Sequence, residues 1–314
     1  MPGLKHYYKN YIGEDFRVKT LNAIERQELI SNLRQTLQQT ELIPPLPETA
    51  RKILLLRNKP DANLDELVKI IENDPALAAF IMKYARMAIY GYGNRITSVT
   101  HAVSLVLGFT TAINVTLGVA SSGCLKIPNY GPLGRVRLWN DALECAQLSR
   151  ELSKHMAKKQ FINTGLAYLG GLLHNFGYLL FAHFCPKEFS ALNDMAAQNP
   201  DQDIRTLELK HFGVTHDLLG LYLLKAWKLP EEVVMMAAKH HYPNCTGKHS
   251  EYVKLVAAAN RLLQKDGKPD NDATSTLSAL LQDLGINEQD AEAELQKIHD
   301  CQDELRNLAQ ELIA

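Results

Sequence analysis

The sequence carries no appreciable excess of charge of either sign. Its 314 residues include 34 Lys and Arg against 35 Asp and Glu, for a formal net charge of −1. Proteins that bind nucleic acid without sequence preference usually carry a basic surplus that neutralises phosphates, so nucleic acid is not an expected partner. With 46% hydrophobic and 22% charged residues, the composition is that of a globular chain with one large domain or two smaller ones.

Cysteine is also scarce. The chain has an odd number of cysteines, and no two of them form a CxxC pair; the five are Cys124, Cys145, Cys185, Cys245 and Cys301. A disulfide framework or a thiolate zinc site is therefore not expected, and the reducing cytoplasm is the expected location. Residues 1–9 lack the apolar segment that is typical of a signal peptide.

No long apolar run is free of polar side chains. The two most apolar stretches, Ser104–Leu125 and Gly165–Phe184, are interrupted by Thr and Asn, or by His and Asn. Membrane helices of about 20 residues rarely hold so many polar groups, so both stretches are predicted to be buried helices, and no membrane insertion is expected.

The common catalytic motifs are missing as well. There is no GxxxxGK[ST] loop, no GxGxxG after a strand, no GxSxG elbow and no HExxH. A P-loop, a dinucleotide-binding fold, a serine hydrolase and a zinc protease are therefore not indicated.

Helical periodicity dominates what is present, and strand alternation is almost absent, which predicts an all-α fold. Asn63 with Glu66, and Asp74 before Pro75, are typical of helix N-termini. Further helices are expected over 48–57, 97–107, 135–156, 164–184, 215–227 and 252–263, and from Pro230 to His240.

The predicted organisation has three parts. Residues 1–41 form a helical extension, residues 42–265 form a domain with halves 42–134 and 135–265, and residues 266–314 form an acidic tail. Residues 271–314 hold ten acidic and two basic side chains, a charge of −8, yet their apolar residues recur at helical spacing. The tail is therefore predicted to be an amphipathic helix that either binds a partner or packs back on the domain.

Four histidines are the candidate chemical groups: His174, His216, His240 and His241. Histidine is a common metal ligand, and a helical bundle can gather such residues from several helices. The alternative is that they are ordinary core or helix-end residues, because a helix C-terminus favours cationic side chains.

A series of short motifs follows one order along residues 42–265. They are LPETA (46–50), IIENDPAL (70–77), YG (90–91), AVSLVLG (102–108), LW (138–139), GGLLHNFG (170–177), FG (212–213), WKLP (227–230) and HH (240–241). Together they resemble the HDOD domain, the "HD-related output domain" of bacterial signalling proteins. The resemblance implies an all-helical bundle similar to HD-type metal phosphohydrolases, where a His, a His-Asp pair and a later Asp hold a metal that activates water.

This sequence departs from that ligand set at three places. Asp141 stands where the first His is expected, Asn175 replaces the Asp of the pair, and Asn260 stands where the closing Asp is expected. His174 alone remains of the four ligands, with His216, His240 and His241 as helpers. An Asn offers only a neutral carbonyl and a competing NH₂ group, so hydrolysis by the usual route is not expected.

The leading hypothesis is a non-enzymatic regulatory module that binds another protein in a signalling pathway, with no cofactor and with the degenerate pocket serving as a buried hydrogen-bond network. A weak divalent site for Fe, Mn or Zn at His174, His216, His240 and Asp141 stays open. Two alternatives remain: a metal-dependent phosphohydrolase of nucleotides or cyclic dinucleotides, and a metal-free nucleotide sensor. In the sensor, Arg86 would contact an anionic ligand.

Overall fold

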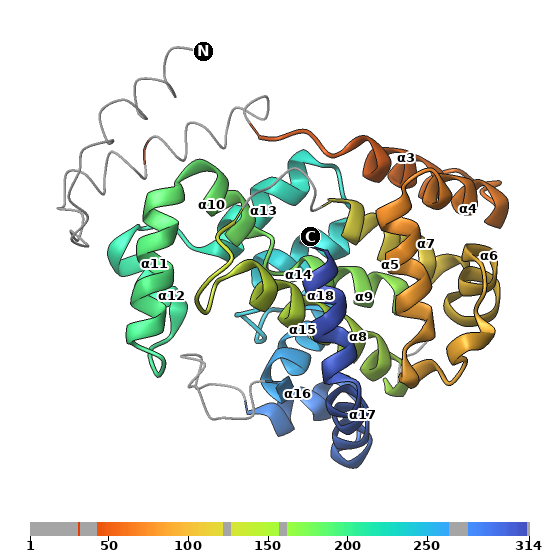
Figure 1. Ribbon diagram of the computed structural model, residues 1–314. Helices are drawn as coiled ribbons and strands as arrows, with labels where there is room; N and C mark the ends of the chain where they lie inside the picture. Colours follow the sequence, from red (N-terminus) through yellow and green to blue (C-terminus); the bar gives the residue numbers. More distant parts are fainter. Residues whose placement is uncertain (1–30, 32–42, 122–126, 157–161, 264–275, 313–314) are drawn as a thin grey trace, which may run out of the picture.

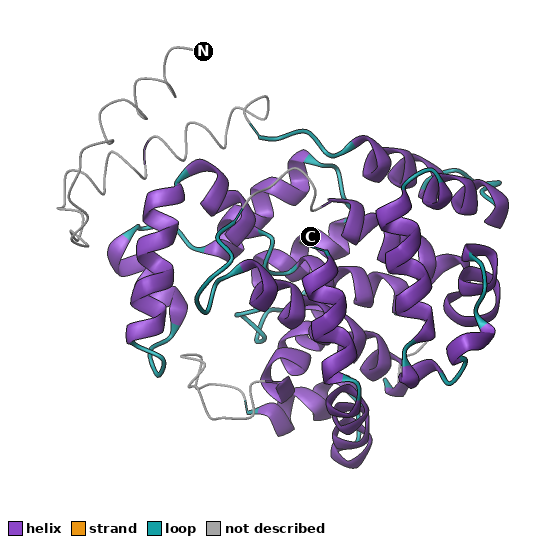
Figure 2. Cartoon of the chain, viewed as in Figure 1, coloured by secondary structure: helices purple, strands orange, loops and turns teal. Residues whose placement is uncertain are grey.

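All regular elements of the described residues are helices. The computed structural model describes residues 31, 43–121, 127–156, 162–263 and 276–312, and this part of the chain contains no strand (Figure 2). The all-α prediction is confirmed. The predicted N-terminal helical extension and Cys124 lie outside the described residues, and the other four cysteines are free thiols.

The N-terminal half supplies the first group of helices. They are α3 (Glu48–Arg57), α4 (Leu64–Glu72), α5 (Pro75–Arg86), the 3₁₀ turns η2 (Ala88–Tyr90) and η3 (Gly93–Arg95), α6 (Val99–His101), the π-helical η4 (Ala102–Leu107) and α7 (Gly108–Ser121). The remaining helices are α8 (Arg135–His155), α9 (Thr164–Leu173), α10 (Gly177–Phe184), α11 (Pro186–Gln198), α12 (Ile204–His211), α13 (His216–Ala226), α14 (Glu231–Lys239), α15 (Ser250–Leu263), α16 (Leu277–Leu284), α17 (Glu288–Asp300) and α18 (Gln302–Glu311).

The N-terminal caps follow from local sequence. Asn63 Oδ1 accepts from the Glu66 backbone N–H at 3.0 Å, while its Nδ2 donates to Glu66 Oε1 at 2.7 Å. Asp74 Oδ1 accepts from the Leu77 N–H at 3.1 Å. Both predicted helix starts are confirmed, because each cap satisfies backbone donors that the first turn leaves free.

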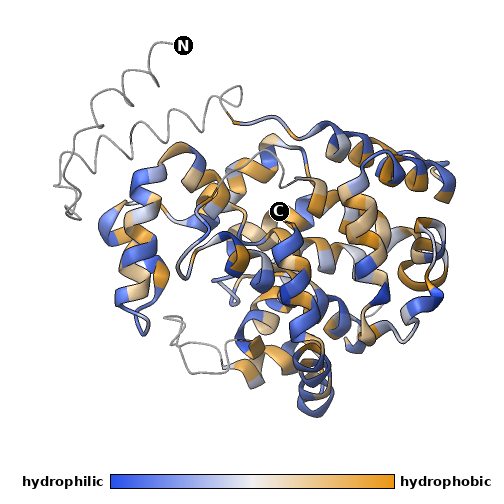
Figure 3. Cartoon of the chain, viewed as in Figure 1, coloured by the Kyte–Doolittle hydropathy of each residue, from blue (hydrophilic) through white to orange (hydrophobic). Residues whose placement is uncertain are grey.

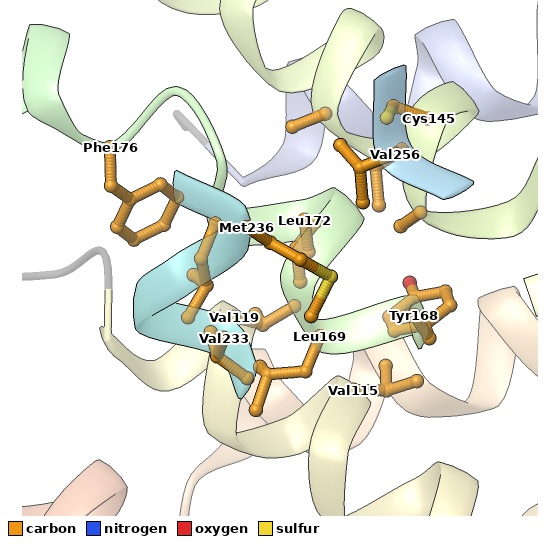
Figure 4. Close-up of a cluster of buried hydrophobic side chains, with 14 of the residues drawn as sticks. Val115, Val119, Cys145, Tyr168, Leu169, Leu172, Phe176, Val233, Met236 and Val256 are labelled. Atoms are coloured by element: carbon orange, nitrogen blue, oxygen red, sulfur yellow. The ribbon is translucent and has the colours of Figure 1, made fainter. Parts of the chain in front are cut away.

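The core forms where α8 and α9 lie side by side. α9 also packs against α7, α14 and α15, so helices of both halves meet around it (Figure 1). Figure 4 shows the buried side chains at this junction, including Val115 of α7, Leu169 of α9 and Met236 of α14. Hydrophobic and hydrophilic residues share most helices (Figure 3), as expected for helices that bury one face.

The apolar segment Val99–Ser121 is the one described helical run that is long and apolar enough to cross a membrane. This holds by length and composition only, and 61% of its most apolar window is buried inside the protein. A buried core helix can have the same length and apolar composition, and α7 indeed packs against α3 and α9.

The predicted helix over 164–184 is wrong in one respect. The chain forms two helices, α9 and α10, with a break at 174–176. Gly177 begins α10, and a Cβ there would lie 1.7 Å from the His216 carbonyl oxygen of α13. The break lets α10 approach α13 closely, a tertiary contact that helical periodicity does not reveal.

The acidic tail is also more divided than predicted. It forms three helices, α16 to α18, and they pack back on the domain against α15, α8 and α5. Glu304 of α18 accepts a hydrogen bond from the Ala88 N–H at 2.9 Å, and Lys83 pairs with Glu311 at 2.5 Å. Of the two alternatives for the tail, the structure has the docked one.

Candidate functional site

Four of the predicted site residues come together at the ends of three helices. His174 follows α9, His216 is the first residue of α13, and His240 and His241 follow α14. His216 Nε2 lies 3.3 Å from His240 Nε2 and 3.1 Å from His241 Nε2. The ring of His174 meets that of His240 edge-on, with centroids 4.9 Å apart. These four residues are called the histidine cluster below.

Each buried ring of the cluster is held through its Nδ1 atom. His174 Nδ1 donates to the Gly171 carbonyl at 2.6 Å, and His240 Nδ1 donates to the Ala237 carbonyl at 3.0 Å. A carbonyl oxygen only accepts, so these contacts place the proton of the neutral ring on Nδ1 and leave Nε2 as a lone pair.

Glu208 of α12 plays the same part for His216. The carboxylate lies 2.8 Å from His216 Nδ1 through Oε1, and it also accepts from the His216 backbone N–H at 3.1 Å through Oε2. Tyr178 of α10 stacks on the other side, with ring centroids 4.2 Å apart and planes within 15°. The imidazole of His216 is thus fixed in position and in tautomer.

Burial keeps His174 and His240 neutral. His174 and His216 are 1% exposed and His240 is 2% exposed, whereas His241 is half-buried. Burial lowers the pKa of His174 to about 3, and it lowers the pKa of His240 well below the ordinary value, with the neighbouring histidines acting in the same direction. The physical cause is the cost of placing a cation away from water.

Three of these rings fit a metal ion. His216, His240 and His241 offer ligand atoms within 4.8 Å of one another. Zinc binds histidine nitrogen at about 2.0–2.1 Å, so two nitrogens on a tetrahedral ion lie about 3.3 Å apart. The observed separations match that value, and Nδ1 atoms held by a carboxylate and a carbonyl are the usual support for such ligands.

The acidic groups beside the cluster are less suited to bind a metal ion. Glu208 is fully buried and is engaged by His216, as described. Asp217, 4% exposed, forms a second possible donor group with Glu208 and His216. Its Oδ1 atom has no hydrogen-bond partner, and Arg205 Nε stands 4.0 Å away, also without one.

The other predicted site residues do not join the cluster's donor groups. Asp141 pairs with Arg137 on α8 at 3.0 Å and lines a different pocket, which contains no histidine. Asn175 follows His174 in the chain and Asn260 lies on α15; both are half-buried. Arg86 is exposed and donates twice to the Ile96 carbonyl, at 2.8 and 2.6 Å, so it ties α5 to the segment that follows.

Sequence reasoning missed three residues of this site. Glu208 lies on α12, in a region for which no helix was predicted, and it meets His216 across the turn between α12 and α13. Tyr178 has the appearance of a core aromatic in the sequence. For Asp217 a signal existed, because it directly follows His216 and so forms a His-Asp pair.

A family model settles the relationship of the chain. The model of the HDOD domain matches residues 43–243. The chain belongs to the HDOD family. The resemblance found in the motifs is therefore confirmed, and the family is one of signal-transduction proteins related to HD phosphohydrolases.

Solved structures agree with this family. The HDOD chain is 30% identical to a protein from Marinobacter aquaeolei VT8 that is provisionally named for signal transduction; the match covers 95% of this chain and 68% of the other, with a TM-score of 0.76. An HDOD domain protein of unknown function from Geobacter sulfurreducens is 23% identical, over 91% and 98% of the two chains, with a TM-score of 0.68. This second likeness shows the fold.

A curated relative is longer than this chain. An uncharacterized protein from Treponema pallidum is 27% identical over 223 residues, which is 71% of this HDOD chain and 42% of the Treponema protein. The HDOD chain thus spans about two fifths of the length of that relative.

Proposed function

We propose that this HDOD protein is a regulatory module without hydrolase activity, which acts by binding another protein in a bacterial signalling pathway. The observation that carries the proposal is the state of the carboxylates around the histidine cluster. Among the described residues, the carboxylate hydrogen-bonded to the cluster is Glu208, and it is occupied by the His216 ring and backbone. Asn175 and Asn260 stand where the family of HD enzymes implies Asp.

Hydrolysis of a phosphoester on a divalent ion needs anionic ligands that hold the ion and orient the attacking water. Neutral imidazoles hold zinc, but they leave its full charge uncompensated, and Asp217 is a nearby buried acid with one unpartnered oxygen. Access to the cluster is restricted too, since three of its four rings are almost fully buried. A buried hydrogen-bond network that fixes the helix ends fits the Nδ1 contacts of the rings and their burial.

The test combines a metal measurement with an activity assay. The full chain is purified without a metal-affinity tag, its Fe, Mn and Zn content is measured, and it is assayed against nucleotides and cyclic dinucleotides with each ion added. The expected result is no hydrolysis under any condition. The proposal fails if hydrolysis appears and is lost in His216→Gln but kept in His183→Gln, a matched change at an exposed histidine of α10.

A metal-dependent phosphohydrolase is the second candidate, and it has one specific observation in its favour. His216 Nε2 stands from both His240 Nε2 and His241 Nε2 at the spacing of two ligands on one tetrahedral ion. The same experiment separates the candidates: stoichiometric metal with hydrolysis supports the enzyme, whereas stoichiometric metal without hydrolysis supports a structural ion in a regulatory module.

The nucleotide sensor has weaker support. Arg86, its proposed anion contact, already donates to the Ile96 carbonyl. A thermal-shift series with nucleotides tests it, because a ligand at 100 times its Kd raises stability by about 2.7 kcal/mol. A nucleotide that raises the melting temperature of the wild-type protein but not of Arg86→Gln would support the nucleotide sensor.

A further inference from the structure

A second polar site lies away from the histidine cluster, where the tail meets the domain. A cavity of about 280 Å³ opens between the loop that precedes α8, the first turns of α8, the end of α15 and helix α18. Its lining combines two acids, Asp141 and Glu144 of α8, with two bases, Arg137 of α8 and Arg306 of α18. This cavity is called the α8–α18 pocket.

The acceptor side of the pocket is built on one face of α8. Asn140 and Glu144 are 6% and 8% exposed, and Asn140 Nδ2 donates to Glu144 Oε1 at 2.9 Å. That contact fixes the amide orientation, because a carboxylate only accepts. Asn140 Oδ1 is then left buried without a donor, which is costly unless a ligand or water supplies one.

The donor side is contributed by α18. The Arg306 side chain is 53% exposed, and its nearest acidic partner, Asp303, is 3.8 Å away and 94% exposed. Such a contact is a weak one. Arg137, by contrast, is already held by Asp141 at 3.0 Å. The guanidinium of Arg306 is therefore the group best able to meet an anion in the pocket.

The loop wall of the pocket is held in place. Asn193 of α11, which is fully buried, donates to the Tyr130 carbonyl at 2.8 Å and accepts from the Leu133 N–H at 2.8 Å. These bonds fix the loop that carries Asn129 and Gly131 into the lining. The pocket is thus formed by anchored segments and not by free side chains alone.

We propose that the α8–α18 pocket binds a small zwitterion, a molecule with a primary ammonium group and a carboxylate such as a free amino acid. The ammonium group would donate to Asn140 Oδ1 and the acids of α8, and the carboxylate would accept from Arg306. The volume lies just below the range of about 300–1,000 Å³ that is typical for drug-sized ligands, so it suits a molecule of few heavy atoms.

The electrostatics of α8 support the position of the ammonium group. Burial raises the pKa of Glu144 and also that of Asp141, and the neighbouring Glu144 carboxylate raises the pKa of Asp141 further. A cation placed between them offsets both effects. Because α18 supplies the opposite wall, an occupied pocket would also fasten the tail to α8, independently of any metal or hydrolysis at the histidine cluster.

The test is calorimetric titration of the full chain with each free amino acid. Two half-ligand probes accompany it: aliphatic amines without a carboxylate, and carboxylic acids without an amine. Saturable binding of at least one amino acid is expected, and each half should bind at least about tenfold more weakly, since each loses a set of charge-assisted hydrogen bonds.

Two variants locate the site. Arg306→Gln should weaken amino-acid binding about tenfold or more, whereas Lys297→Gln, which removes a positive charge from neighbouring α17, should leave it within about twofold. Asn140→Leu, which removes the unpartnered Oδ1 at similar side-chain volume, should also weaken amino-acid binding about tenfold or more. The proposal is overturned if no amino acid binds, if an amine or an acid alone binds as tightly, or if Arg306→Gln binds unchanged.

Discussion

Replacing Glu208 tests whether the histidine cluster is a stabilising network. Glu208→Ala removes the acceptor of the His216 Nδ1–H and of the His216 backbone N–H, at 2.8 and 3.1 Å. Both donors stay buried, because His216 is 1% exposed. An unsatisfied buried donor costs about 1–3 kcal/mol, so leaving both donors unsatisfied should lower the free energy of unfolding by about 2–6 kcal/mol.

The measurement is urea unfolding followed by far-ultraviolet circular dichroism, with the slope m compared between variants to confirm that the same transition is observed. Glu208→Gln is the control, since its amide keeps the shape and one acceptor oxygen, and its cost should be about 1–2 kcal/mol. A loss below about 1 kcal/mol in Glu208→Ala would show that water or another group satisfies His216, and would refute the reasoning.

Three further predictions concern packing and charge. Gly177→Ala should destabilise the fold strongly, because its Cβ would lie 1.7 Å from the His216 carbonyl oxygen. In Gly220→Ala the nearest atom to the new Cβ is the Cβ of Ala237 at 3.6 Å, so this variant should be neutral or stabilising by about 0.5–1 kcal/mol in the same urea assay. Between pH 6.5 and about 3, His174 binds a proton in the unfolded state but not in the folded state, so the free energy of unfolding of chelator-treated protein should fall with falling pH. An equal dependence of the free energy of unfolding on pH in His174→Gln would contradict this. Leu305→Ala, at a fully buried position of α18, should cost about 2–5 kcal/mol, while Leu209→Ala, at a 51% exposed position, should cost less than about 0.5 kcal/mol by thermal melting; similar costs for both would mean that the tail is not docked in solution.

The sequence allows prediction of what depends on nearby residues. The caps at Asn63 and Asp74 satisfy backbone donors within three residues, so their signals lie in the sequence itself. The bounds of α3 match the predicted helix over 48–57, although its N-cap residue, Pro47, makes no side-chain hydrogen bond. Helix type and the ordered motifs were enough to recognise the HDOD domain.

The features that the sequence could not predict depend on contacts between residues on different helices. The break after His174 exists because Gly177 lies against α13, and the approach of Glu208 to His216 depends on how α12 returns to α13. The position of Asp141 is a similar case. The family pattern suggested a place beside the histidines, but the side chain pairs with Arg137 one turn earlier and faces the pocket shared with α18.

The docking of α18 has a consequence for synthesis on the ribosome. Glu304 contacts Ala88 across 216 residues of sequence, and Glu311 contacts Lys83 across 228. At about 5–20 residues per second, α5 therefore waits roughly 10–45 s for its partner helix to be made. During that interval the surfaces of α5 and α8 that α18 covers are open to water, to chaperones and to other nascent chains, so this HDOD protein completes its N-terminal half only after translation has passed nearly all of the described chain.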